Sequence, residues 1–398
     1  MNDAERMGSF AAFPEAEAVS DAVIHSTFSD PMGIEDFWFR WYLNGFVDQG
    51  HGKVKCVLGR PGSGKTHFLR HLAMKAREVG YQAAYVDAAK ERISLVDELY
   101  RAVATKVDWS DIVDKALWSV ITGELGYPEF SGFVSQFIAW GESTRHLSPN
   151  LLRRDVREAI DRFLYTVDLQ PDFSMGLRTW MNQEVSLEPG STAVREWLQG
   201  NKLGVSQRKS LGVRSNVSRR NARSFLASLA SFIHYAQGQG LMIFIDNIDT
   251  MAAKTRVEGR PYYTRSARDQ SYEMIRELID ESPFTPYLMT VIAGNTDQVT
   301  NSKTGFPSYP ALWTRLQNEV QSPNPNRFAD VLDLDRMWEK DESQQEALTR
   351  HWGETPIEWS TLPQETPIRN SMGLEWGRPR RMVAEVVKQR LPETRGDL

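Results

Sequence analysis

The sequence has a single cysteine, Cys56, among its 398 residues. One thiol excludes an intrachain disulfide framework and a zinc cluster built from cysteines. The chain also lacks any apolar run near the roughly 18 residues that a membrane helix requires. Its first residues do not follow the basic-then-apolar order of a secretory signal peptide. Together these absences favour a cytoplasmic protein that does not enter a membrane.

An overall excess of positive charge is missing too, since 47 Lys and Arg face 52 Asp and Glu for a net charge of −5. Acidic residues, however, are absent from 197–245. Seven basic residues gather in 202–223: Lys202, Arg208, Lys209, Arg214, Arg219, Arg220 and Arg223. The rest of the chain therefore carries −12, which is −5 minus 7. The cluster fits nucleic-acid phosphates, but it equally fits an acidic protein partner or a solvated loop.

What the sequence does contain is the alternation of strand and helix patterns that is typical of an α/β protein. Apolar runs predict strands at 53–58, 83–88, 241–246 and 287–295. Helical spacing of apolar residues predicts helices at 67–80, 218–236 and 265–281, and Ser218 is the expected N-cap of the second. We therefore expect a three-layer α/β core.

The remaining segments divide the chain into three parts. Residues 1–32 are small, polar and acidic, and they predict a flexible N-terminal arm. Residues 33–335 form the predicted core, in which about 91–215 have helical patterns, many tryptophans and no convincing strand. We interpret 91–215 as a helical insertion and 336–398 as a small helical C-terminal lid.

The strongest motif is a glycine-rich loop between the first predicted strand and helix. Residues 59–66 match G-x-x-x-x-G-K-[ST] at every fixed position. Its backbone N–H groups would surround phosphates, its lysine would contact the β- and γ-phosphates, and its threonine hydroxyl would bind Mg²⁺. The predicted nucleotide contacts are Gly59, Arg60, Pro61, Gly62, Ser63, Gly64, Lys65, Thr66 and the following His67.

A second acidic element completes the predicted site. Asp246 ends a buried strand and is the expected partner of Thr66 in holding Mg²⁺. Many related ATPases carry a glutamate after this aspartate, but here Asn247 follows. An amide orients water but cannot accept its proton. Three readings stay open: slow hydrolysis with ATP as a binding switch, Asp249 as the substitute base, or a carboxylate from elsewhere, including a partner subunit.

Three further residues are candidate sensors of the nucleotide. Asn295 ends a predicted strand beside the Asp246 strand, where its amide would face the γ-phosphate. Arg315 lies on a predicted helix and is either an arginine finger for a neighbouring subunit or a surface residue. Arg380 belongs to the GRPRR segment that opens the last helix, where it would contact either the phosphates or another macromolecule.

The order GRPGSGKT, FIDNID, a strand ending in Asn295 and then GRPRR resembles AAA+ ATPases, most of all their replication-initiator branch. That resemblance implies Arg380 as a second sensor. Longer segments, SRRNARSFLASLASFIHYAQGQGLMIFID and GFPSYPALWTRL among them, resemble the ATP-binding proteins of bacteriophage-exclusion (BREX) defence systems. The resemblance implies ATP and Mg²⁺ as ligands. It also implies a defence or DNA-transaction role, either as a homo-oligomer or within a multi-protein complex.

Overall fold

The computed structural model describes residues 21–186, 191–253, 256, 258–320, 326–338, 377, 379 and 382. Its centre is one five-stranded sheet in which all pairs of neighbouring strands are parallel. In spatial order the strands are β2 (Gln82–Asp87), β3 (Leu241–Asp246), β4 (Leu288–Asn295), β1 (Lys53–Gly59) and β5 (Val331–Asp333). Their apolar runs are buried on both sides because helices cover both faces, as a parallel sheet requires.

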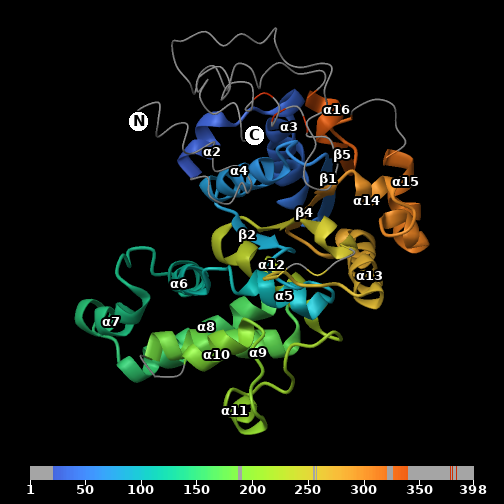
Figure 1. Cartoon of the computed structure of the whole chain (residues 1–398). Helices are drawn as coiled ribbons and strands as arrows, with labels where there is room; N and C mark the ends of the chain where they lie inside the picture. Colours follow the sequence, from blue (N-terminus) through green and yellow to red (C-terminus); the bar gives the residue numbers. More distant parts are fainter. Residues whose placement is uncertain are drawn as a thin grey trace, which may run out of the picture.

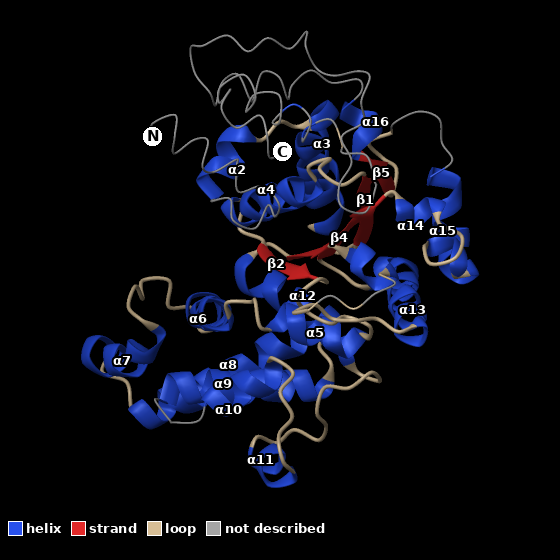
Figure 2. Cartoon of the chain, in the orientation of Figure 1, coloured by secondary structure: helices blue, strands red, loops and turns tan. Residues whose placement is uncertain are grey.

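Two helical layers enclose this sheet (Figure 2). On one face lie α3 (Ile34–Phe37), the helix Trp38–Val47 and α4 (Lys65–Glu78), which pack against the alternate strand residues Val57, Phe244 and Val291. On the other face lie α5 (Val96–Ala104), α12 (Ala222–Gln237), α13 (Arg265–Glu281) and α15 (Pro310–Val320). The α/β prediction is therefore confirmed at the level of a helix-covered parallel sheet.

Between β2 and β3 the described residues contain helices and no strand. These helices extend from one side of the sheet toward the lower end of the molecule in Figure 1. Besides α5 and α12 they are α6 (Trp109–Ser119), Val120–Glu124, Val134–Gln136, α7 (Phe137–Arg145), α8 (Pro149–Thr166), α9 (Pro171–Ser186), α10 (Ser191–Leu198) and α11 (Val205–Ser210). Aromatic side chains such as Trp109, Phe173 and Trp197 are buried where this group packs on α12.

The N-terminal region holds more structure than the sequence predicts. Within the predicted arm, Asp21–Thr27 forms helix α2, followed by a turn of 3₁₀ helix at Pro31–Gly33. Helix α2 packs on α4, where Ile24 is buried and Asp21 pairs with Arg70 at 2.7 Å. The described part of 1–32 thus belongs to the folded layer next to α4.

The predicted start of the helix before β3 is wrong. Helix α12 begins at Ala222, and Ser218 does not cap it. The Ser218 backbone N–H instead donates to Asn221 Oδ1 at 2.7 Å, which closes a turn over 218–221. Arg219 and Arg220 therefore lie in this turn, and Arg223 alone of the three occupies the helix. Such local side-chain bonds compete with the helix start and delay it.

Short elements complete the carboxyl end of the fold. They are 3₁₀ turns at Ile248–Ala252, Ser282–Phe284 and Phe306–Ser308, helix α14 (Asp297–Thr300) and helix α16 (Leu334–Trp338). Helix α16 spans the predicted boundary at residue 336 and packs on β1 and β5 through Leu334 and Met337. No helix among the described residues is long and apolar enough to cross a membrane.

Candidate functional site

The glycine-rich loop connects β1 to α4 and turns on glycines with left-handed backbone. Gly62 and Gly64 have φ of 76° and 89°, which side-chain-bearing residues rarely adopt. A Cβ on Gly59 would lie 2.3 Å from Ser63 Oγ, so that position also requires glycine. The backbone of this loop therefore depends on glycine at positions 59, 62 and 64.

The side chains of Lys65 and Ser63 suit this loop to bind an anion. Lys65 is buried, and its ammonium donates to the carbonyls of Gly59 and Arg60 at 2.9 Å each. Burial lowers the Lys65 pKa, and the nearby carboxylates Asp249 and Asp246 oppose that shift. Ser63 Oγ is buried without a hydrogen-bond partner among the described atoms. A phosphate would satisfy both groups, and helix α4 directs its N-terminus at the same place.

The acidic strand meets the glycine-rich loop directly. Asp246 Oδ2 accepts hydrogen bonds from Thr66 Oγ1 at 2.7 Å and from the Tyr85 hydroxyl at 2.5 Å. Asp246 is 1% exposed, and this burial raises its pKa against the effect of both bonds. A hydroxyl and a carboxylate side by side are oxygen ligands of the kind that Mg²⁺ prefers. The two residues predicted to hold Mg²⁺ are thus adjacent.

Asn247 leaves β3 in a left-handed conformation, with φ of 58°. Its side-chain Nδ2 donates to Asp87 Oδ1 at 2.9 Å, while its backbone N–H donates to Asp246 Oδ1 at 2.8 Å. The amide that replaces the usual glutamate is therefore paired with a carboxylate on the neighbouring strand.

Asp249 also lies at this edge of the sheet. Its carboxylate interacts with Lys65 and accepts a hydrogen bond from the Asn295 backbone, although burial still raises its pKa. Asn295 ends β4, with β3 on one side and Gly59 of β1 as its register partner on the other. The structure brings these predicted residues together around the glycine-rich loop.

Several residues near the carboxyl end of the described chain also contact this loop. The Arg60 backbone N–H donates to Asp335 Oδ2 at 2.6 Å, and Trp338 Nε1 donates to the Ser63 carbonyl at 2.9 Å. The Gly377 N–H donates to the Pro61 carbonyl at 2.9 Å. A Cβ on Gly377 would come within 2.6 Å of Ser63 Cα, so glycine permits this close approach. No motif marked α16, although GRPRR did mark Gly377.

Tyr85 and Asp87 were missed as well. The sequence signal that could have identified them is the strand 83–88, which ends in an aspartate much as LMIFID does. In a parallel sheet two such carboxyl ends meet at one edge. The structure places Asp87 opposite Asp246 in register.

Other predicted residues lie away from the loop. His67 turns toward α2, where its Nε2 contacts the Ile24 carbonyl at 3.1 Å and its ring stacks near Phe28. Arg315 makes two hydrogen bonds of 2.9 Å to the Asp280 carboxylate on α13. Arg380 lies outside the described residues.

The members of the basic cluster lie on different elements. Lys202, Arg208, Lys209 and Arg214 lie at or beside α11, at the far tip of the insertion in Figure 1. Arg219 and Arg220 are exposed in the turn before α12. Arg223 forms ion pairs with Glu277 and Glu281 of α13. The 16 residues of α12 separate this turn from β3 by about 24 Å, so closeness in sequence to the acidic strand is not closeness in space.

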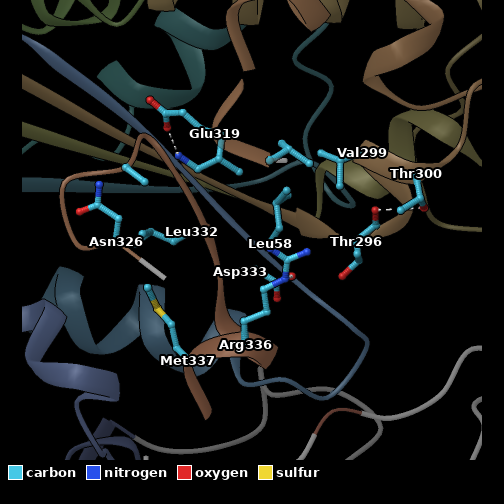
Figure 3. A pocket seen from close by; sticks show the side chains of 13 residues that line it. Leu58, Thr296, Val299, Thr300, Glu319, Asn326, Leu332, Asp333, Arg336 and Met337 are labelled. Atoms are coloured by element: carbon cyan, nitrogen blue, oxygen red, sulfur yellow. Dashed lines mark hydrogen bonds and ion pairs between the residues drawn. The ribbon is translucent and has the colours of Figure 1, made fainter. Parts of the chain in front are cut away.

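A cavity of about 110 Å³ lies beside the ends of β1 and β5 and is lined by Leu58, Leu332 and Asp333, together with Thr296 (Figure 3). Leu58 and Met337 form part of its apolar wall, and Thr296, Asp333 and Arg336 lie together at one end. None of the described residues that line it belongs to 59–66 or to the Asp246–Asp249 segment. It is therefore a neighbour of the phosphate loop and not part of it.

Comparison with known families agrees with this geometry. The family model of the BREX system ATP-binding proteins BrxC/D matches residues 45–344, which include the glycine-rich loop, the helical insertion, β3 and β4. The chain belongs to the BREX ATP-binding family. No curated protein and no solved structure matches it. Membership confirms the resemblance seen in the sequence and identifies the chain as an ATP-binding protein of anti-phage defence.

Proposed function

We propose that this BREX-family protein binds ATP with Mg²⁺ at the glycine-rich loop. The observation that carries the proposal is the 2.7 Å contact between Thr66 Oγ1 and Asp246 Oδ2. It joins the hydroxyl at the start of α4 to the carboxylate at the end of β3, and these two oxygens would hold Mg²⁺. Lys65 would leave the carbonyls of Gly59 and Arg60 for the β- and γ-phosphates.

Asn295 supports an AAA+-type arrangement of this site. Asn295 is the last residue of β4, which lies between β1 and β3 in the sheet. It therefore lies at the edge of the sheet between the glycine-rich loop and Asp246. We infer that Asn295 senses the γ-phosphate. Arg315 does not support an arginine-finger role, because its guanidinium is already engaged by Asp280 within the same chain. The lid and the sensor role of Arg380 remain predictions.

In this account the nucleotide state controls assembly on DNA, with sister subunits or within a multi-protein defence complex. Arg219 and Arg220 support a DNA contact, since both are exposed in the turn before α12. Arg223 supports it less, because α13 already supplies two carboxylates to it. The competing account is a DNA-stimulated motor or loader that turns ATP over rapidly.

Steady-state ATP hydrolysis with and without duplex DNA separates the two accounts, measured beside Asn247→Glu. For a nucleotide-controlled assembly factor we expect slow wild-type turnover that Asn247→Glu accelerates, because the new carboxylate accepts a proton from water. Fast wild-type turnover that DNA stimulates further would contradict this proposal and establish the motor. Failure of the wild type to bind Mg·ATP would contradict both.

A further inference from the structure

A second carboxylate stands at the edge of the sheet beside Asp246. Asp87 ends β2, is the register partner of Asp246 and is 6% exposed. Register partners in a parallel pair direct their side chains to the same face of the sheet. Tyr85, two residues earlier on that face, reaches Asp246 with its hydroxyl. Asp87 therefore lies on the face that carries Thr66 and the start of α4.

Only one of the two oxygens of the Asp87 carboxylate, Oδ1, is hydrogen-bonded among the described residues. Its Oδ1 accepts hydrogen bonds of 2.9 Å from Asn247 Nδ2 and from the Ala89 backbone N–H. No described residue forms a hydrogen bond to its Oδ2. The left-handed turn at Asn247 directs the amide toward β2. The Asn247 amide therefore binds the carboxylate that ends the neighbouring strand.

We propose that Asp87 supplies the carboxylate that residue 247 lacks, and that Asn247 is the residue that positions it. The acid stands at the end of β2, and the amide that orients it follows β3. This inference rests on the proposed ATP site and identifies the carboxylate from elsewhere that the sequence left open.

In the reaction Asp87 orients a water molecule for attack on the γ-phosphate. The water oxygen bonds to the γ-phosphorus while the bond from that phosphorus to the β,γ-bridging oxygen breaks. ADP leaves with the bridging oxygen and its electron pair, and the γ-phosphoryl group becomes inorganic phosphate. The proton released by the water passes to the Asp87 carboxylate and from there to solvent.

Asp249 is the rival carboxylate, and its contacts favour a different task. It lies by Lys65 and accepts a hydrogen bond from the Asn295 backbone, so its charge stabilises the buried ammonium and the β4 end. Among the residues that the structure describes, Asp87 forms no ion pair, and its side chain accepts hydrogen bonds from the N–H groups of Asn247 and Ala89. The Asp249 carboxylate is thus engaged by Lys65, whereas the Asp87 carboxylate is left to orient water.

The experiment measures Mg·ATP affinity, ATP turnover and thermal unfolding for five full-length proteins. They are the wild type, Asp87→Asn, Asn247→Ala, Asp249→Asn and the control Asp168→Asn, whose aspartate is exposed on the insertion. We expect Asp87→Asn to lower turnover about 100-fold or more with unchanged affinity, because a positioned base contributes 10²–10⁴-fold. Asn247→Ala should lower it by roughly tenfold, since the carboxylate stays but loses its orientation.

Three results would overturn this inference alone: turnover in Asp87→Asn equal to wild type, loss of turnover confined to Asp249→Asn, or a wild type that binds Mg·ATP without turning it over. If Asp87→Asn does not fold, retention of full turnover in Asn247→Ala is the overturning result. A wild type that does not bind Mg·ATP would instead refute the proposed ATP site itself.

Discussion

At the scale of single residues, the histidine after the phosphate-loop threonine shows how a motif neighbour is used for packing. His67 contacts the Ile24 carbonyl through Nε2, and burial lowers its pKa to about 4. The same side chain was a predicted nucleotide contact because it follows Thr66 in sequence. A helix directs successive residues 100° apart, so the neighbour of a ligand-binding residue faces elsewhere. In this case it faces α2.

The pKa of His67 makes a pH dependence testable. Between pH 6.5 and 4 the unfolded chain binds the proton at this site and the folded chain does not. Stability therefore falls as the pH is lowered through this window, by about 1–2 kcal/mol at pH 5. We expect His67→Gln, which keeps a donor for Ile24, to reduce the loss of melting temperature between pH 7 and pH 5. An equal loss in both proteins would show that His67 is not responsible.

At the scale of elements, residues near the carboxyl end of the described chain contact the backbone of the glycine-rich loop. Asp335 and Trp338 of α16 bind its backbone, and Gly377 binds the Pro61 carbonyl. These contacts link residues more than 270 positions apart along the chain. The loop and its helix were predictable from local patterns. The contacts of Asp335, Trp338 and Gly377 with the loop were not predictable. A short helix such as α16 has no periodic pattern, and no local pattern shows which distant segment it contacts.

The close approach of Gly377 can be tested with one methyl group. Gly377→Ala places a Cβ within 2.6 Å of Ser63 Cα, which is backbone and cannot rotate away. We expect a loss of about 1–3 kcal/mol in stability and weaker nucleotide binding, as for other overpacked sites. The matched control is Gly123→Ala, where a Cβ meets nothing within 4 Å. Equal melting curves for the two variants would contradict the contact.

The bounds of β3 and β4 were predicted more closely than the start of α12. The runs 241–246 and 287–295 agree with β3 and β4 to within one residue because continuous burial on both sheet faces imposes an unbroken apolar run. The start of α12 was missed by four residues because the Asn221 side chain binds the Ser218 backbone N–H and closes a turn over 218–221, which the apolar spacing does not reveal. The partnership of Asn247 with Asp87 depends on strand order, which no local pattern specifies.

At the scale of the whole molecule, charge and nucleotide chemistry occupy separate regions. The phosphate loop lies at the α2, α4 and α16 end in Figure 1, whereas α11 and its basic neighbours lie at the tip of the insertion. A DNA contact at that tip would communicate with the ATP site through α12, which leads into β3. Four of the seven positive charges thus belong to the insertion, and the other three lie at the start of α12, away from the glycine-rich loop.

Equilibrium binding of ATP to the full-length chain, with and without Mg²⁺, tests the central claim most directly. The wild type should bind one ATP per chain, and Mg²⁺ should strengthen binding through Thr66 and Asp246. Lys65→Ala should weaken it by a factor of ten or more, since a buried charge-assisted contact contributes about 1.5–3 kcal/mol. The exposed control Lys209→Ala should bind as the wild type does. Undiminished binding by Lys65→Ala would contradict the account.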